Sequence, residues 1–132
     1  MVKFTISSER ISPEFISAAL SLDPDRSSHV ARVPEGSILG RPARINSWQL
    51  VEEGVAGEDV TDLLERIEVR VAGLREPIAE LLRNGCSTLL SIVQYCSLLD
   101  EAGPGFVVKS SLLGFLSDVG AAIDVDQYVI DQ

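Results

Sequence analysis

His29 is the only histidine of the chain, so catalysis that depends on a histidine would have to use it. A Ser–His–Asp or Cys–His site needs an imidazole beside an activated nucleophile. No serine stands in a nucleophile-elbow pattern, and neither Cys86 nor Cys96 is expected at the start of a helix. One histidine and two distant cysteines cannot complete a tetrahedral zinc site. We therefore predict a non-enzymatic chain with no catalytic residue, no metal and no cofactor.

Asp124 and Asp126 are a pair of carboxylates whose i, i+2 spacing puts both on one face of a strand. Two such groups could hold Mg²⁺ or Ca²⁺, or work as an acid/base pair if burial separated their pKa values. Either chemistry needs further ligands that the sequence does not identify. The favoured interpretation is the polar face of a half-buried strand, or a charged edge that discourages aggregation.

Other acidic groups have structural explanations. Asp23-Pro24-Asp25 is typical of a helix stop followed by a turn, because a residue before proline is pushed out of the helical region. The acids between Glu52 and Glu65 lead into the predicted start of a helix, where the helix dipole favours negative charge. A solvated helix start is the favoured interpretation, and the alternative is a surface that receives a basic partner.

The segment 34–44 holds two glycines and two prolines and is predicted to be the mobile tip of a long hairpin. Arg41 and Arg44 flank its glycines, but the P-loop pattern and the GxGxxG pattern are both absent. An anion site or partner contact at these arginines is the alternative to a solvated tip. Ile38 and Leu39 need an explanation, because two adjacent aliphatic side chains in a loop are expected to dock on the sheet or on a partner.

Trp48 is the only tryptophan, and it lies in a predicted strand. Core packing with a bonded indole N–H is the default for such a residue. Beside Tyr95 on a sheet, Trp48 could instead form the floor of a ligand site or the centre of a protein interface. Trp48, Tyr95, Arg41 and Arg44 are therefore the predicted partner-binding or ligand-binding residues.

The balance of charge and composition limits the class of protein. The 132 residues are 45% hydrophobic and 23% charged, which predicts one globular domain over residues 1–132. The net charge of −9 disfavours nucleic acid and favours a basic protein partner. Residues 1–44 carry six basic and five acidic groups, and residues 45–132 carry five basic and fifteen acidic groups. Such asymmetry can mark an interaction surface.

No apolar stretch reads as a signal peptide or membrane helix, so no membrane association is expected. Cys86 and Cys96 are expected about 33 Å apart on one strand, far beyond disulfide reach. Free thiols fit a reducing compartment, and we predict a cytoplasmic protein. A homodimer is left as an open possibility.

Residue patterns predict the order β-α-β-β-α-β-β-α-β. Alternating or continuous apolar residues predict six strands, at 2–6, 29–33, 45–51, 88–97, 106–109 and 123–130. Helices are predicted after Ser12, after Asp59 and after Ser110 or Ser111, with Pro77 as a kink or the first turn of a second helix. The first half of strand 88–97 has apolar residues at both odd and even positions, so this strand is expected to be covered on both faces. The predicted class is α+β, with a single mixed, mostly antiparallel sheet and helices on one face.

Five stretches of the sequence resemble one family. They are 4–6 with 10–16, 46–50, 93–95, 106–109 and 123–128. Together they are similar to the bacterial family called domain of unknown function 4279, and the likeness covers essentially the whole chain. The resemblance implies no established activity, so no catalytic residue is carried over. It admits an immunity-type role, in which the chain would block a toxin with a basic active-site surface.

The residues and their charges together favour a protein-binding domain. An acidic surface can steer a basic protein to fast association. The alternative is a small-ligand-binding or regulatory module that uses the free face of the sheet as its floor.

Overall fold

The computed structural model describes residues 1–55, 58–97, 99 and 105–130. In these residues five strands form one sheet, with the spatial order β2-β3-β1-β4-β5. The strands are β1 Val2–Ser8, β2 Arg26–Ser28, β3 Asn46–Glu52, β4 Ser87–Ser97 and β5 Ala122–Ile130. β1 is antiparallel to both of its neighbours, β2 is antiparallel to β3, and β5 is parallel to β4. The predicted class, α+β with a mixed and mostly antiparallel sheet, is confirmed.

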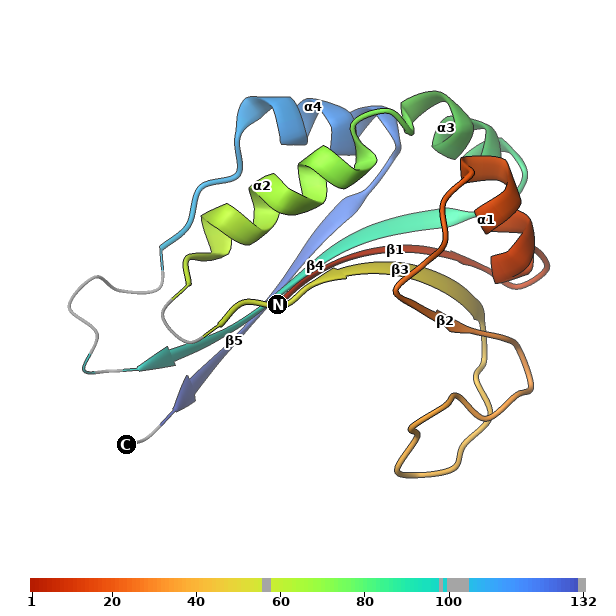
Figure 1. The fold of residues 1–132 in the computed structure, drawn as a ribbon, viewed down its shortest axis with the longest axis horizontal. Helices are drawn as coiled ribbons and strands as arrows, with labels where there is room; N and C mark the ends of the chain where they lie inside the picture. Colours follow the sequence, from red (N-terminus) through yellow and green to blue (C-terminus); the bar gives the residue numbers. More distant parts are fainter. Residues whose placement is uncertain (56–57, 98, 100–104, 131–132) are drawn as a thin grey trace.

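Helices cover one face of this sheet (Figure 1). They are α1 Pro13–Leu20, α2 Val60–Val71, α3 Arg75–Arg83 and α4 Ser110–Asp118. The Ser12 and Asp59 side chains accept backbone N–H groups at the starts of α1 and α2, as the sequence predicts. α2 packs on the central strands β1 and β3, and the Phe115 ring of α4 lies with its centroid 6.0 Å from that of the Phe4 ring on β1.

Strict alternation along β1 sets the two faces of the sheet. Val2, Phe4 and Ile6 are fully buried under the helices, while Lys3 and Thr5 lie on the opposite face. The same period of two holds in β3 and in the first half of β4. One continuous core therefore lies between the sheet and the helices, and the other face of the sheet stays open.

Three predicted strand features are wrong. The edge strand is Arg26–Ser28 rather than 29–33, and beyond it only an isolated bridge joins Val30 to Ala43. Residues 106–109 form no strand, because they run alongside α2, where the backbone N–H of Val107 donates to the Thr61 hydroxyl. β4 is buried on its helix side and half-buried on its open side, so it is not covered on both faces.

One helix prediction is confirmed and one is wrong. Pro77 lies in the first turn of a second helix, since α3 starts at Arg75 and Pro77 is its third residue. Neither Ser110 nor Ser111 caps α4. Its N-cap is Lys109, and the Ser111 hydroxyl donates to the Glu68 carboxylate on α2 instead.

Trp48 is fully buried on the helix side of β3. Its indole Nε1–H donates to the Ser17 hydroxyl of α1 at 3.1 Å, so the polar end of the ring is satisfied inside the core. The ring therefore attaches α1 to the sheet through both packing and a hydrogen bond.

Replacing Trp48 by alanine should lower the free energy of unfolding by about 3–5 kcal/mol, because the cavity cannot collapse fully. The exposed Phe15 on the same helix α1 gives the control, since Phe15→Ala should change stability by less than about 0.5 kcal/mol. Urea denaturation followed by circular dichroism measures both values. A Trp48→Ala protein as stable as the control would contradict the core role.

Candidate functional site

The open face of the sheet carries small polar side chains at its centre. Gln49 donates to the Thr5 hydroxyl at 3.3 Å, and the Ser28 and Ser47 hydroxyls lie 2.6 Å apart. These contacts join β1 to β3 and β3 to β2. The part of the open face formed by β1, β3 and β2 thus carries polar side chains that bond to one another, and Leu89 of β4 lies next to Thr5 on this face.

Two tyrosines form an aromatic platform at one end of this face. The parallel register sets Tyr95 of β4 beside Tyr128 of β5, with ring centroids 5.5 Å apart and ring planes inclined by 27°. The rings are packed together, yet Tyr95 is 66% exposed and Tyr128 is 53% exposed. Asp124 and Asp126 share this face, because they alternate with Tyr128 along β5. The platform therefore combines exposed aromatic area with carboxylates.

A protruding arm, residues 32–43, borders the open face at its other end. Its base is closed by Ala31 N–H to Ala43 O at 2.9 Å and by Ala43 N–H to Arg32 O at 2.8 Å. The arm hangs below the sheet on the side away from the helices (Figure 1). Ile38 is 99% exposed and Leu39 is 72% exposed on it. These aliphatic side chains are thus presented to solvent and do not dock on the sheet.

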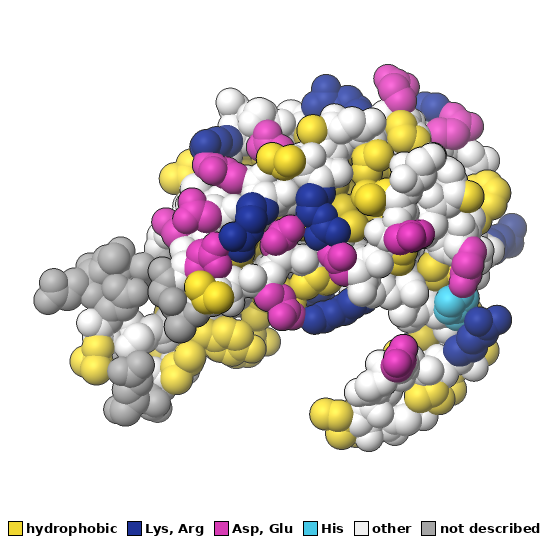
Figure 2. Space-filling model, in the orientation of Figure 1, with side chains coloured by type: hydrophobic (Ala, Val, Ile, Leu, Met, Phe, Trp, Pro, Cys, Tyr) yellow, Lys and Arg dark blue, Asp and Glu magenta, His cyan; other side chains and the backbone are white. Residues whose placement is uncertain are grey.

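The space between the two ends is hollowed. Figure 2 shows a concavity under the sheet, between the arm and the far ends of β4 and β5, with hydrophobic side chains on both of its borders. We call this concavity the trough. Its floor is the polar centre of the open face, and its borders are the tyrosine platform and the arm.

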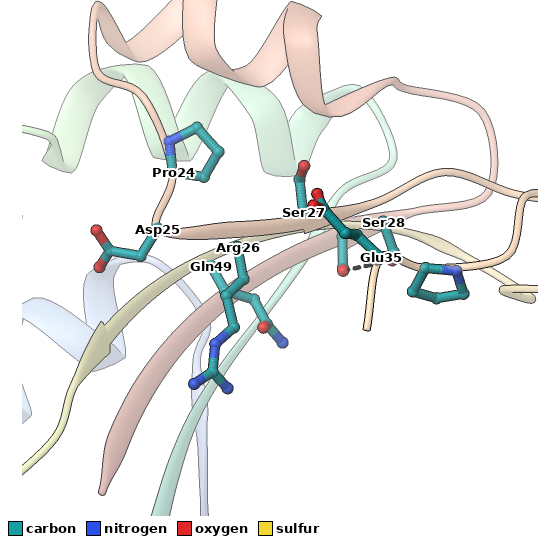
Figure 3. A pocket seen from close by; sticks show the side chains of 9 residues that line it. Pro24, Asp25, Arg26, Ser27, Ser28, Glu35 and Gln49 are labelled. Atoms are coloured by element: carbon teal, nitrogen blue, oxygen red, sulfur yellow. Dashed lines mark hydrogen bonds between the residues drawn. The ribbon is translucent and has the colours of Figure 1, made fainter. Parts of the chain in front are cut away.

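An open polar hollow of about 590 Å³ lies between β2, β3 and the start of the arm. Arg26 and Gln49 project from the same face there, while Asp25 points away from them (Figure 3). The guanidinium of Arg26 is bound to Glu53 at 2.7 Å. The hydroxyls of Ser27, Ser28 and Ser47 and the amide of Gln49 line this hollow and offer hydrogen bonds to a bound group.

Asp25 fixes the edge of the sheet to α2. Its carboxylate receives two bonds from Arg70, at 2.6 and 3.0 Å, and one from the Val51 backbone N–H at 2.7 Å. The hydrogen bonds from Arg70 are the main reason that the pKa of Asp25 is lowered, and the Val51 N–H adds to this. The Asp23-Pro24-Asp25 motif thus has a structural role. In the described residues, no group of three or more histidine, cysteine, aspartate or glutamate side chains is placed to hold a metal ion.

Most acids around α2 are paired within the chain. Glu52 contacts both Arg66 and Arg70, and Glu58 contacts Arg66 at 2.6 Å. The bond from Arg66 lowers the pKa of Glu58. The acids from Glu52 to Glu65 are therefore largely occupied by the protein's own cations rather than left for a partner. Asp124 and Asp126, by contrast, take part in none of the ion pairs that join described residues.

The predicted binding residues separate into three places. Trp48 lies in the core and Tyr95 on the open face, so the two cannot share a floor. The register aligns Trp48 with Ile6 and Thr88 on the helix side, and Tyr95 lies seven residues after Thr88 along β4, so it faces the other way. The ligand floor built from both is thus wrong. Arg41 and Arg44 are exposed, on the arm and just after it.

The remaining candidates show no assembled chemistry. His29 lies at the edge of the protein, 2.5 Å from the Glu14 carboxylate at the start of α1. The pKa of the Glu14 carboxyl is lowered, mainly by a hydrogen bond from its own backbone N–H and to a lesser extent by the hydrogen bond with His29. Cys86 is buried, which raises its pKa, and both cysteines are free thiols. Within the described residues, no helix has the length and apolar character needed to cross a membrane.

Sequence reasoning did not single out Tyr128 as a partner of Tyr95. Its position at i+2 from Asp126 and i+4 from Asp124 indicates a shared strand face. The match with Tyr95 depends on the parallel register of β4 and β5, which no local pattern specifies.

The comparison with known families decides the relationship. A family model described as a domain of unknown function, DUF4279, matches residues 1–130. The chain belongs to this family. The resemblance inferred from the sequence is confirmed, and the match spans all five strands and four helices of the described residues. No curated protein and no solved structure matches the chain.

The substitution Asp25→Asn tests the ion pair between Asp25 and Arg70. We expect a loss of about 1 kcal/mol at neutral pH, because the pair is partly exposed and screened by water. The folded-state pKa of Asp25 lies below its unfolded value, so this stability is present above the unfolded pKa and is lost as pH falls through the folded pKa. The difference in stability between the variant and the wild type should therefore begin to shrink below about pH 4 and continue to shrink as pH falls further. Urea denaturation across pH 3–7 measures this, and the exposed Asp23→Asn serves as the control.

Shortening the arm tests whether it supports the fold. Residues 34–42 replaced by a four-residue turn leave the bonds of Ala43 in place. Loop closure changes slowly with length, so stability should change by about 1 kcal/mol or less. Chemical denaturation measures the change. A loss of more than about 3 kcal/mol would mean that the arm is part of the core structure.

Proposed function

We propose that this chain is a non-enzymatic, cytoplasmic protein-binding domain, and that the trough is its binding surface. The observation that carries the proposal is the exposure of large apolar side chains on both borders of the trough. Tyr95 and Tyr128 form the exposed platform at one border, and Ile38 and Leu39 are exposed on the arm at the other. Tyrosines at the centre of interfaces supply large contact area with a polar end, and exposed apolar patches mark interaction sites.

The shape of the surface supports a macromolecular partner. Small-ligand sites are enclosed pockets that bury most of the ligand. The trough is wide and open, and the polar hollow beside β2 is open as well. A partner that contacts both borders at once must be large enough to cross the polar floor.

The charges support a basic partner. The net charge is −9, and the ion pairs around α2 engage many acids with cations of the same chain. Asp124 and Asp126 stand beside the tyrosine platform on the open face. A lysine or arginine side chain can bind a carboxylate and the face of a tyrosine together. In the more specific form of the proposal the partner is a toxin with a basic active-site surface, which this chain would block.

Affinity capture from the native host, with the purified chain as bait, tests the proposal. We expect one protein to be retained by the wild type and lost by Tyr95→Ala and by the double variant Ile38→Ser with Leu39→Ser. Both changes affect exposed side chains, so each variant should keep its free energy of unfolding within about 1 kcal/mol. Titration calorimetry with the purified partner should show affinity that falls as salt rises.

Phe15→Ala is the matched control, because Phe15 is an exposed aromatic residue like Tyr95 but lies on the helix side. Retention of the partner by all trough variants, with loss in Phe15→Ala, would place the interface on the helices and contradict the proposal. Recovery of no protein partner at micromolar bait concentration would contradict protein binding itself. A specific metabolite that raises the melting temperature would then favour a ligand-binding module.

A further inference from the structure

β5 differs from the other strands of the described sheet, because all nine of its residues are exposed. Every other strand there has at least one position that is buried or half-buried. β5 is also an edge strand, with β4 on one side only. Its outer edge therefore offers backbone N–H and C=O groups to another strand along its whole length.

Apolar side chains on β5 make this edge unusual. Ile123, Val125 and Val129 point to the helix side, in register with Leu90, Ile92 and Cys96 of β4, yet all three are exposed. A long edge strand with exposed apolar residues is the kind of edge that pairs with another chain unless something blocks it.

We propose that the outer edge of β5 pairs with β5 of a second copy of this chain, antiparallel and centred on Gln127. In a two-fold pair of this kind the axis runs perpendicular to the sheet, so each face continues as the same face in the other copy. Residues that lie opposite each other then have the same parity. The residue on the two-fold axis is the centre of the pair. If that centre is any one of the five residues from 124 to 128, at least five residues of each β5 strand lie opposite the other copy.

The two aspartates exclude three of these five registers. A centre at residue 124 or 126 sets an aspartate directly opposite itself, and a centre at 125 sets Asp124 opposite Asp126 of the second copy. Like charges directly opposite on one face are destabilising. Only the centres at Gln127 and Tyr128 keep the carboxylates apart.

The centre at Gln127 has the better match of the two. It pairs residues 124 to 130, whereas the centre at Tyr128 pairs only 126 to 130. It also sets Val125 opposite Val129 of the second copy on the helix side. On the open face it sets Asp126 opposite Tyr128 of the second copy, where the phenol O–H can donate to the carboxylate. Asp124 and Asp126 thus select one register rather than block pairing altogether.

The pairing would give one ten-stranded sheet with both open faces on the same side. The tyrosine platforms of the two copies would then lie on either side of the two-fold axis. This inference does not depend on the proposed function, because it rests on the edge of β5 and is tested without any partner.

Sedimentation equilibrium of the purified chain, over about a hundredfold range of concentration up to the high micromolar, tests the pairing. We expect a reversible rise from the monomer mass to twice that mass. Added salt should strengthen the association, since each copy carries a net charge of −9 and screening weakens their repulsion. A monomer at every concentration, or growth beyond the dimer, would overturn the proposal.

Charge substitutions test the register. Val125→Glu sets a charge opposite Val129 of the second copy and should weaken the dimer at least about tenfold. The double variant Val125→Glu with Val129→Lys sets opposite charges together twice in the dimer and should restore it. Association that is insensitive to Val125→Glu, or a double variant weaker than the single one, would overturn the proposal.

Cross-linking gives a second test that does not depend on affinity. In a Cys96→Ser background, Gln127→Cys brings two thiols together at the axis, so oxidation should give a covalent dimer. Val125→Cys is the matched control, because it faces Val129 of the second copy rather than itself. Cross-linking of Val125→Cys but not of Gln127→Cys would contradict the register. A monomeric chain whose β5 variants lose a captured foreign protein would assign this edge to that protein instead.

Discussion

The fold depends on the strict two-residue alternation of β1 at the centre of the sheet. Val2, Phe4 and Ile6 can be buried only if helices gather on their side, and the four helices supply that cover. The same alternation sends Lys3 and Thr5 to a face that small polar side chains can leave in water. A shift of one residue in the pairing with β3 or β4 would exchange the two faces, so the hydrophobic effect holds the register at the middle of the sheet.

The margins of the sheet are held by polar contacts. Asp25, Arg70 and the Val51 N–H attach the β2 edge to α2, and the buried Trp48 attaches α1 through Ser17. At the opposite margin, β5 contributes side chains to neither face of a closed core. This contrast leaves exposed apolar area at the borders of the sheet and a polar floor at its centre.

The binding surface and the paired edge that we propose have the same physical origin. Helices cover one face of the sheet and leave β5 exposed, so the open face and the β5 edge are both free for other proteins. In a dimer joined at β5, two troughs would open on the same side. A partner with repeated basic side chains would then gain avidity from binding both at once.

Local patterns in the sequence determined a large part of this structure. Alternation at 2–6, the capping residues Ser12 and Asp59, and the helical period after Asp59 each predicted their element, because neighbouring residues decide such features. The face that each strand presents was less evident. Residues 88–97 have apolar side chains at both odd and even positions, and only the position of the helices shows which face of this strand is covered.

The tertiary structure alone decided which distant residues meet. Tyr95 meets Tyr128 through the parallel register of two strands that are separated by α4, and Trp48 and Tyr95 prove to lie on opposite faces. Asp25 finds Arg70, which lies 45 residues away. Such contacts depend on strand order and register, and these are set by the burial of the whole core rather than by the residues that come into contact.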